Sequence, residues 1–463
     1  MSHVIGLVCR ECGTEYPHTI QNTCYECFGP LEVKYDWDLI QEKVSKEKIA
    51  KGANSIWRYA DLLPVESEVR VDLGAGFNKL HKADRLGAEI GLKNLYLLDE
   101  SVNPTYSFKD RVTSVAVTKA MEFGATAIGC ASTGNLAAAV GAHAAKAGLP
   151  AYIFIPDSIE IGKIVQMLVY GSNVIAVSGN YDDANRLASE VADMHPDWAF
   201  VNINIRPYYT EGSKTIAFET TEQLNWETPD HVVIPMASGA LLCAINRGFK
   251  ELEKVGLVQE SKVHISGAQP LNCSPIASAV INDTDVIPIK DYETVAHSLA
   301  IGNPADGYYA KEVINNSGGF AAAPTDEEVI DGIHLLARTE GIFTEPAGGT
   351  TIAGLKILAE SGHIDSDERV VVYVTGNGLK AQDTLVNSVR HPTTIKPTLS
   401  EFEKLLKLQN SKKETLQKEI IMQKQRRNLK NGKSKIFVCF AEYNKNKRNQ
   451  FGDWTNYNKR CIE

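Results

Sequence analysis

The feature that most constrains the fold is an alternation, between about residues 94 and 385, of short β-rich runs with longer stretches of helical periodicity. The clearest β-rich runs are 151–155, 173–177, 231–234 and 369–374, and helical patterns follow the first three at 161–170, 182–193 and 241–254. Such alternation predicts an α/β fold in which parallel sheets are covered by helices on both faces. Ligands of these sheets bind at the carboxyl ends of strands, so the strand-to-helix turns are the candidate sites.

The composition indicates a folded chain made of two differently charged parts. With 43% hydrophobic residues among 463, the chain has enough apolar material for packed cores, which excludes a disordered protein. The net charge is −9, but residues 401–463 hold 16 Lys and Arg against 7 Asp and Glu. That end therefore carries +9 and residues 1–400 carry −18, so only the basic end is a candidate polyanion binder.

Four of the nine cysteines cluster near the start in two CxxC pairs, Cys9 with Cys12 and Cys24 with Cys27. This spacing is typical of a zinc ribbon, in which two CxxC turns supply four sulfurs to one tetrahedral ion. The alternatives are disulfides or chance cysteines, which a reducing compartment disfavours. Because four sulfurs leave no open coordination position, we expect the zinc to be structural.

Two strand-to-helix turns carry a lysine and a group of hydroxyls. Residues 101–111 follow a strand at 95–98 and place Lys109 at a helix start, where the dipole favours the neutral amine that a Schiff base requires. Alone, a Lys-Asp-Arg run more often marks a solvated helix face. Residues 131–135 precede a helix at 136–146, and their hydroxyls and free N–H groups suit an anion. The alternative there is a plain Ser/Thr N-cap.

Two later turns consist mostly of small residues. Residues 235–241 connect a strand to a helix and can cradle a phosphate, although they contain a single glycine. Residues 373–379 end a strand with two glycines that allow the backbone to approach a ligand closely. Either turn taken alone is equally consistent with an ordinary connection.

Taken in order, the four turns resemble those of the pyridoxal-phosphate (PLP) enzymes of the tryptophan-synthase-β fold, or fold type II, and most closely those of threonine synthases. The resemblance covers roughly residues 5–390 and includes the stretches 181–184, 211–215, 301–304 and 345–348. It implies two open, mostly parallel twisted sheets with helices on both faces. A small zinc module built on the four N-terminal cysteines precedes them, and a basic C-terminal extension follows.

The resemblance also implies a role for each turn. Lys109 is expected to bond covalently to the cofactor aldehyde, Asn135 to bond the cofactor's phenolic oxygen, and Thr375 to face the pyridine nitrogen. The cofactor phosphate is expected at Ala237, Ser238, Gly239, Ala240 and Leu241. We expect substrate contacts from Ser107, Ser132 and Thr133, and donors to phosphate from Arg111, Arg206 and Lys214.

The implied reaction converts O-phospho-L-homoserine and water into L-threonine and phosphate by PLP-dependent elimination and hydration. Two positions depart from the family pattern. Tyr106 stands where many relatives carry Gly, and Tyr209 stands where many bacterial members carry Arg. The alternatives within the fold are a cysteate synthase acting on O-phosphoserine and sulfite, or a threonine dehydratase-like eliminase. A regulatory protein with a degenerate enzyme body is a further alternative, which Lys109, Asn135 and Thr375 together disfavour.

We expect a zinc module at 1–35, a two-lobed catalytic body at 36–396 and a basic extension at 397–463. The last part of the extension interleaves aromatic and basic residues, as some single-strand nucleic-acid binders do, but it contains no complete binding motif. Nucleic-acid binding is therefore not the favoured interpretation. Because a signal peptide and a long apolar run are lacking, we expect a cytoplasmic protein without a membrane span. The resemblance favours a homodimer.

Overall fold

The computed structural model describes residues 2–132, 134–157, 161–260, 262–386, 388–389 and 391–408. Internal contacts divide the chain into two units, Met1–Val389 and Arg390–Glu463. In the second unit, residues 399–408 are helical, and the rest of the expected basic extension lies outside the described residues. The domain boundaries expected from the sequence stay predictions.

The first unit begins with a three-stranded antiparallel sheet that carries the cysteine pairs. Its order is β2 (Glu15–Tyr16), β1 (Val4–Cys9), β3 (Leu31–Tyr35). The segments α1 (Trp37–Lys43), α2 (Lys46–Ala50) and η1 (Ile56–Leu62) follow it. Leu7, Leu31 and Val33 of this sheet are buried in the same core cluster as residues of the catalytic body, so the module packs onto the body.

The larger sheet of the body has six strands and is parallel except at one edge. Its order is β12 (Ala321–Ala322), β11 (His264–Ala268), β10 (His231–Pro235), β13 (Arg369–Val374), β5 (Asn94–Asp99) and β4 (Leu80–Lys82), with β4 antiparallel to β5. The central strands are almost continuously buried because helices cover both faces.

Alternate residues of β13 show how the two faces are covered. Val371 and Tyr373 belong to a cluster with residues of α8 (Arg206–Gln223), α9 (Ala240–Lys254), α10 (Pro275–Ile281) and α11 (Gly307–Asn316). Val370 and Val372 belong to another with residues of α3 (Asp84–Ile90), α12 (Asp326–Glu340) and α13 (Pro346–Glu360). This period of two is the one that a strand buried on both faces requires.

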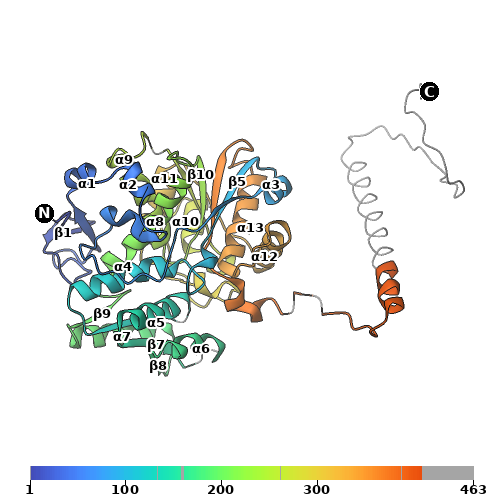
Figure 1. The fold of residues 1–463 in the computed structure, drawn as a ribbon, viewed down its shortest axis with the longest axis horizontal. Helices are drawn as coiled ribbons and strands as arrows, with labels where there is room; N and C mark the ends of the chain where they lie inside the picture. The colour runs from blue at the N-terminus through green and yellow to red at the C-terminus, as the bar shows by residue number, and fades with distance from the viewer. Residues whose placement is uncertain are drawn as a thin grey trace, which may run out of the picture. The chain divides into compact units, whose positions relative to one another are not determined.

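The smaller sheet has four parallel strands in the order β8 (Asn173–Val177), β7 (Ala151–Pro156), β6 (Ala127–Ala131) and β9 (Trp198–Phe200). Its helices are α4 (Lys109–Glu122), α5 (Asn135–Ala147), α6 (Ile161–Val169) and α7 (Tyr181–Met194), and Figure 1 shows α5, α6 and α7 around this sheet. The short 3-10 segments of the body are η2 (Glu100–Val102), η3 (Leu271–Cys273), η4 (His297–Leu299) and η5 (Gly378–Thr384). The expected two mostly parallel sheets with helices on both faces are therefore confirmed.

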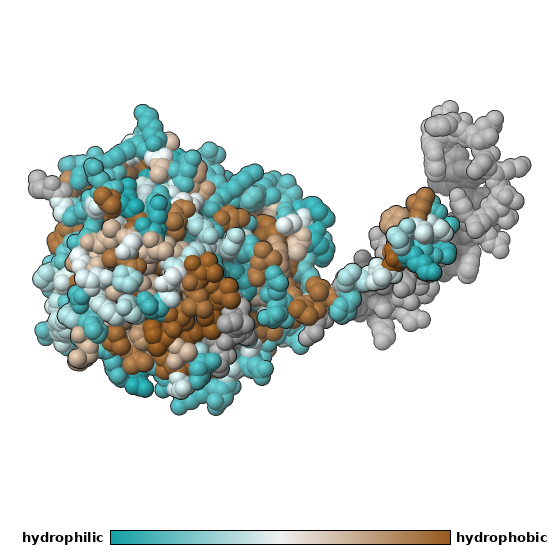
Figure 2. All heavy atoms as spheres, turned by 60° about the horizontal axis from the view of Figure 1, so that its bottom comes forward, coloured by the Kyte–Doolittle hydropathy of each residue, from teal (hydrophilic) through white to brown (hydrophobic). Residues whose placement is uncertain are grey.

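The surface carries some exposed apolar side chains, which gather in brown areas on the face shown in Figure 2. On α6, Val165, Leu168 and Val169 are exposed. Within the described ranges, no helix is long and apolar enough to cross a membrane.

The helices α4 and α8 approach closely because α8 carries a glycine at their contact. A Cβ at Gly212 would lie 2.5 Å from both the Arg111 carbonyl oxygen and the Val112 Cα. The same contact brings the first turn of α8 to the first turn of α4, where Lys109 lies. Gly212 therefore sets the spacing of two helix starts that belong to the candidate site.

We expect Gly212→Ala to force α4 and α8 apart. Overpacking lowers the free energy of unfolding by about 1–3 kcal/mol. The higher helix propensity of alanine offsets about 1 kcal/mol of this loss. A net loss in the free energy of unfolding should appear in urea denaturation. Thr210→Ala, close by in the same helix and bonded only within it through its hydroxyl, is the matched control. A Gly212→Ala protein more stable than the wild type would be incompatible with this close approach.

Candidate active site

The turns singled out in the sequence meet because the strands before them end at the same edge of the larger sheet. The strands β10, β13 and β5 are parallel neighbours, so residues 235–241, 374–378 and 99–109 leave the sheet side by side. Residues 131–135 follow β6 of the smaller sheet and join them through a contact to the start of α13. This arrangement places three segments of the site on one sheet and the fourth on the other.

Lys109 is the first residue of α4 and faces a tyrosine. Its Nζ donates to the Tyr209 hydroxyl at 2.8 Å and lies 4.6 Å from the centroid of the Phe108 ring. Tyr209 is 8% exposed, so this contact is largely shielded from water. The amine is thus held by one hydroxyl and the aromatic face of its neighbour.

The loop before Lys109 is fixed by buried hydrogen bonds. The Asp110 carboxylate accepts from the Thr105 N–H at 2.7 Å and from its hydroxyl at 2.9 Å, while Lys380 Nζ donates to the Thr105 carbonyl at 2.8 Å. Burial raises the pKa of Asp110 to about 6, although the Thr105 donors oppose the shift. Tyr106 has φ = 67°, a left-handed conformation that glycine adopts at low cost and that other residues adopt less readily.

Thr375 follows β13 and lies against the lysine loop. The Phe108 N–H donates to the Thr375 carbonyl at 3.0 Å, and Ser107 pairs with Gly376 in an antiparallel bridge. Thr375 is 2% exposed. The Ser107 hydroxyl is buried and has no hydrogen-bond partner among the described residues. An unpartnered buried hydroxyl beside Lys109 is a polar group available to a ligand.

Asn135 begins α5 and contacts Glu345, a buried glutamate at the N-cap of α13. Its Nδ2 donates to both Glu345 carboxylate oxygens, at 2.9 and 3.0 Å. Burial raises the pKa of Glu345, and the Asn135 amide and the charges of Lys380 and Lys109 oppose the shift. Ser132 is half-buried nearby, and Thr133 lies outside the described residues.

The residues Ala237–Leu241 form a turn from β10 into α9. Gly239 is the N-cap of α9 with φ = 91°, and it makes no side-chain cap hydrogen bond. Among the described residues, the Ser238 hydroxyl has one hydrogen-bond contact, a long one accepted from the Ala240 N–H at 3.4 Å. Ala237 packs in the same small cluster as Ala347 of α13, two residues after Glu345. N–H groups at the start of the 15-residue α9 are thus placed for an anion on the side where the other turns meet.

Two of the three expected phosphate donors, Arg111 and Lys214, are occupied by buried ion pairs. Arg111 is fully buried, and its Nη2 donates to Glu100 at 2.6 Å and to Glu219 at 2.9 Å. Lys214 is also fully buried, where it pairs with Glu211 and with Glu251 at 2.8 Å. Buried cations paired with carboxylates are not free to bind a substrate phosphate.

Arg206 is better placed than the other two cations. It begins α8, its side chain is 25% exposed, and it pairs with Asp306, whose N–H donates to the Ser238 carbonyl at 2.9 Å. Asp306 therefore links Arg206 to the turn Ala237–Leu241, where the cofactor phosphate is expected. Sequence reasoning missed the contacts of Tyr209 and Glu345, although both lie in or beside stretches singled out for their family resemblance.

The four cysteines come together as the spacing predicts. Within the described chain their sulfurs all lie within 4.8 Å of one another, and Cys9 Sγ lies 3.4 Å from Cys27 Sγ. A tetrahedral zinc site with Zn–S bonds of about 2.3 Å places its sulfurs about 3.8 Å apart. The cluster therefore fits a single ion without rearrangement of the chain.

A cavity of about 710 Å³ lies away from Lys109, between α9 and α11. Arg10, Lys250, His264 and Tyr309 are among its lining residues, and none of the residues of the four turns lines it. The cavity and the four turns therefore lie at different places. We take the place where the four turns meet as the candidate active site, because ligands of such sheets bind at strand ends.

The fold and these turns define an enzyme that uses PLP. The chain matches the family described as "Pyridoxal-phosphate dependent enzyme" over residues 71–376, and it belongs to that family. Two solved structures share the fold. They are the processed form of threonine deaminase isoform 2 from Solanum lycopersicum (TM-score 0.57, 19% identity, 67% of this chain and 84% of that one) and diaminopropionate ammonia lyase from Escherichia coli (TM-score 0.58, 21% identity, 68% and 88%).

Relatives with higher sequence identity show to which group of PLP-dependent enzymes the chain belongs. The chain is 42% identical over 403 residues to the threonine synthase of Methanocaldococcus jannaschii, which covers 86% of this chain and 98% of the relative. It is 40% identical over 392 residues to that of Methanosarcina acetivorans, covering 84% and 95%. It therefore belongs to the threonine synthase family of PLP-dependent lyases.

The Arg111 contacts predict a structural effect for Arg111→Ala. Removing one partner of a buried ion pair costs about 3–5 kcal/mol, because the other charge is left buried and uncompensated. Chemical denaturation should show this loss. The matched control is Arg338→Ala, whose exposed pair with Glu89 is worth about 1 kcal/mol or less. A weaker affinity for phosphorylated substrate at unchanged stability would restore the original expectation for Arg111.

Proposed function

We propose that the protein converts O-phospho-L-homoserine and water into L-threonine and phosphate, with PLP held at the four turns. The observation that carries this proposal is the placement of Lys109 beside the Tyr209 hydroxyl, where the turns containing Asn135, Ser238 and Thr375 meet. The names of the relatives that cover nearly the whole catalytic body support the choice of substrate.

The residues present fit PLP. The N–H groups of Ala237–Leu241 at the start of α9 would hold its phosphate, and the Asn135 amide, which is held by Glu345, would donate to its phenolic oxygen. The Thr375 hydroxyl would face the ring nitrogen. When bound, PLP supplies an electron sink for carbanions formed at Cα and Cβ of the substrate.

The chain's own task is to move protons and to position the substrate. Lys109 Nζ is proposed to take the proton from Cα and to return a proton later, as a general base and acid. Tyr209 would hold that amine in place between the steps through its 2.8 Å contact. Glu345 holds the Asn135 amide in place through contacts of Nδ2 with both carboxylate oxygens, and one of these contacts would be exchanged for the cofactor's phenolic oxygen.

Substrate contacts are proposed for hydroxyls and for one arginine. Ser107, Ser132 and Thr133 are proposed to hold the substrate carboxylate, and the unpartnered Ser107 hydroxyl supports this for one of them. Arg206 remains the proposed donor to the substrate phosphate, because Arg111 and Lys214 form ion pairs with buried carboxylates. Product analysis with O-phosphoserine and sulfite would separate this activity from that of a cysteate synthase.

The cysteine cluster is proposed to bind one structural zinc ion through Cys9, Cys12, Cys24 and Cys27. The compact cluster of sulfurs supports this, and their number leaves no position open for a substrate. We also propose a cytoplasmic homodimer, for which the exposed apolar residues of α6 are available as an interface.

Lys109→Ala should abolish the visible absorption of bound PLP and lower turnover about a thousandfold or more, since nucleophile and general base are lost together. Phosphate release from O-phospho-L-homoserine measures turnover. The control is Lys356→Ala, an exposed lysine of α13 that pairs with Glu360 one turn away. Phosphate release at the wild-type rate by the Lys109 variant would refute the assignment.

Removal of zinc by a chelator should lower the melting temperature, because a structural metal stabilises only the folded state. The protein that stays folded should keep its specific activity when PLP is saturating. Cys24→Ser provides the control, since its melting temperature should already be low and should no longer respond to chelator. Immediate loss of turnover without unfolding would instead indicate a catalytic metal.

A further inference from the structure

Arg10, between the first two cysteines of the cluster, reaches from the cysteine module to the start of α11. Its Nη1 lies 4.0 Å from Asp306 Oδ1, and its guanidinium carbon lies 3.7 Å from the centroid of the Tyr309 ring. Its Nε lies 3.6 Å from Glu32 in β3 of the module. The Arg10 side chain is 25% exposed, so these charges are only partly screened by water.

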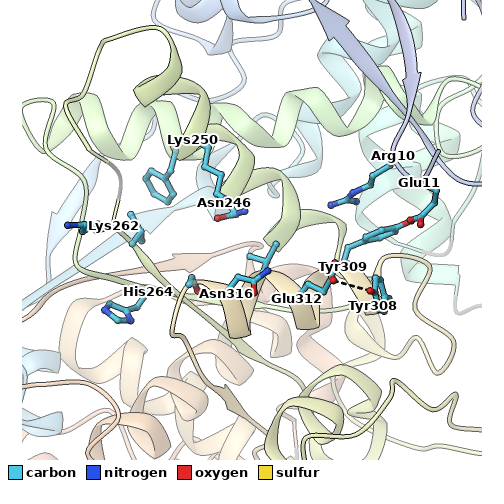
Figure 3. A pocket seen from close by; sticks show the side chains of 14 residues that line it. Arg10, Glu11, Asn246, Lys250, Lys262, His264, Tyr308, Tyr309, Glu312 and Asn316 are labelled. Carbon is cyan, nitrogen blue, oxygen red and sulfur yellow. Dashed lines mark hydrogen bonds between the residues drawn. The ribbon is translucent and has the colours of Figure 1, made fainter. Parts of the chain in front are cut away.

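A second contact runs parallel to the first. The Tyr309 hydroxyl donates to the Glu11 carboxylate, and Figure 3 shows Arg10 and Glu11 next to Tyr309 at one end of the large cavity. Arg10 and Glu11 lie between Cys9 and Cys12 of the first CxxC pair, whose sulfurs are proposed to bind the metal. Because Arg10 and Glu11 both contact residues at the start of α11, a movement of this turn would also move α11.

Asp306 connects these contacts to the turn proposed to bind the cofactor phosphate. Its N–H donates to the Ser238 carbonyl at 2.9 Å, and its carbonyl oxygen would lie 2.8 Å from a Cβ at Gly239. Its carboxylate accepts from Arg206 as well as facing Arg10. Asp306 is 7% exposed and lies at the N-cap position of α11, and because its N–H is bonded to Ser238, a shift of Asp306 would move Ser238 and Gly239 with it.

We propose that Arg10 is a positioning residue through which the metal-bound cysteine module holds the phosphate turn in its binding conformation. The turn needs such support because Gly239, at φ = 91°, is the residue type with the most conformational freedom to lose. Donors that are already oriented bind an anion without the entropic cost of ordering the turn. The inference rests on the proposed binding of PLP at Ala237–Leu241.

The test compares PLP affinity in zinc-loaded holoenzyme variants. Each variant is dialysed against graded PLP concentrations, and bound PLP is read from its visible absorption. Arg10→Met keeps much of the apolar stem but loses the charge, and we expect about tenfold weaker PLP binding. Lys34→Met is the matched control, because Lys34 is a cation of the same module whose ion pair is with Glu15 of that module. Its PLP affinity should equal that of the wild type.

Two further readouts separate positioning from loss of folding. The ³¹P resonance of the bound cofactor should shift in Arg10→Met, whereas the melting temperature of the protein freed of PLP should stay close to that of Lys34→Met. If Arg10 acts through Asp306, adding Arg10→Met to Asp306→Asn should weaken PLP binding no further. Additive losses would mean that Arg10 acts by another route and would overturn the proposal.

The outcomes also distinguish this inference from the proposed function. A wild-type protein that binds no PLP would defeat the proposed function itself. A wild type that binds PLP, with Arg10→Met of equal affinity and an unchanged ³¹P resonance, would defeat only the role of Arg10.

Discussion

The buried ion pairs of Arg111 fix the position on which the rest of the site depends. Arg111 lies two residues after Lys109 in the first turn of α4, and it is held by Glu100 after β5 and by Glu219 in α8. Burial alone would lower the pKa of Arg111, but these carboxylates raise it, so the guanidinium stays charged. One cation thus joins a strand end and two helices around Lys109. Because an uncompensated charge here is costly, the arrangement tolerates little displacement.

The fold was largely predictable from the sequence, and the physical reason is burial. Strands such as β6, β10 and β13 are covered on both faces, so their sequences are continuous apolar runs that end at turns. The strands β4, β9 and β12 were not predicted, because two or three residues are too short to show a pattern. The antiparallel β4 lies at an edge, where its register depends on its neighbour β5 rather than on its own sequence.

The site was predictable as a set of turns but not as a set of contacts. The turns that contain Lys109, Asn135, Ser238 and Thr375 could be singled out because each follows a strand, and the family resemblance supplied the expected role of each residue. The partners of Lys109 and Asn135 lie 100 and 210 positions further along the chain, and only the packing of α8 and α13 brings them together. Arg111 looked like a phosphate donor for the same reason, since Glu219, 108 positions away, gives no local sign of its presence. The cysteine spacing was more informative, because four ligands of one ion need only two adjacent turns.

The central claim is that the carbon–oxygen bond of a phosphorylated homoserine breaks at this site and that water then adds to the substrate. The most direct measurement is to supply O-phospho-L-homoserine in ¹⁸O-labelled water and to examine both products by mass spectrometry. We predict L-threonine with one labelled hydroxyl oxygen and phosphate that carries no label at release, because water adds to carbon and not to phosphorus. Labelled phosphate together with unlabelled homoserine would mean simple ester hydrolysis and would contradict the account.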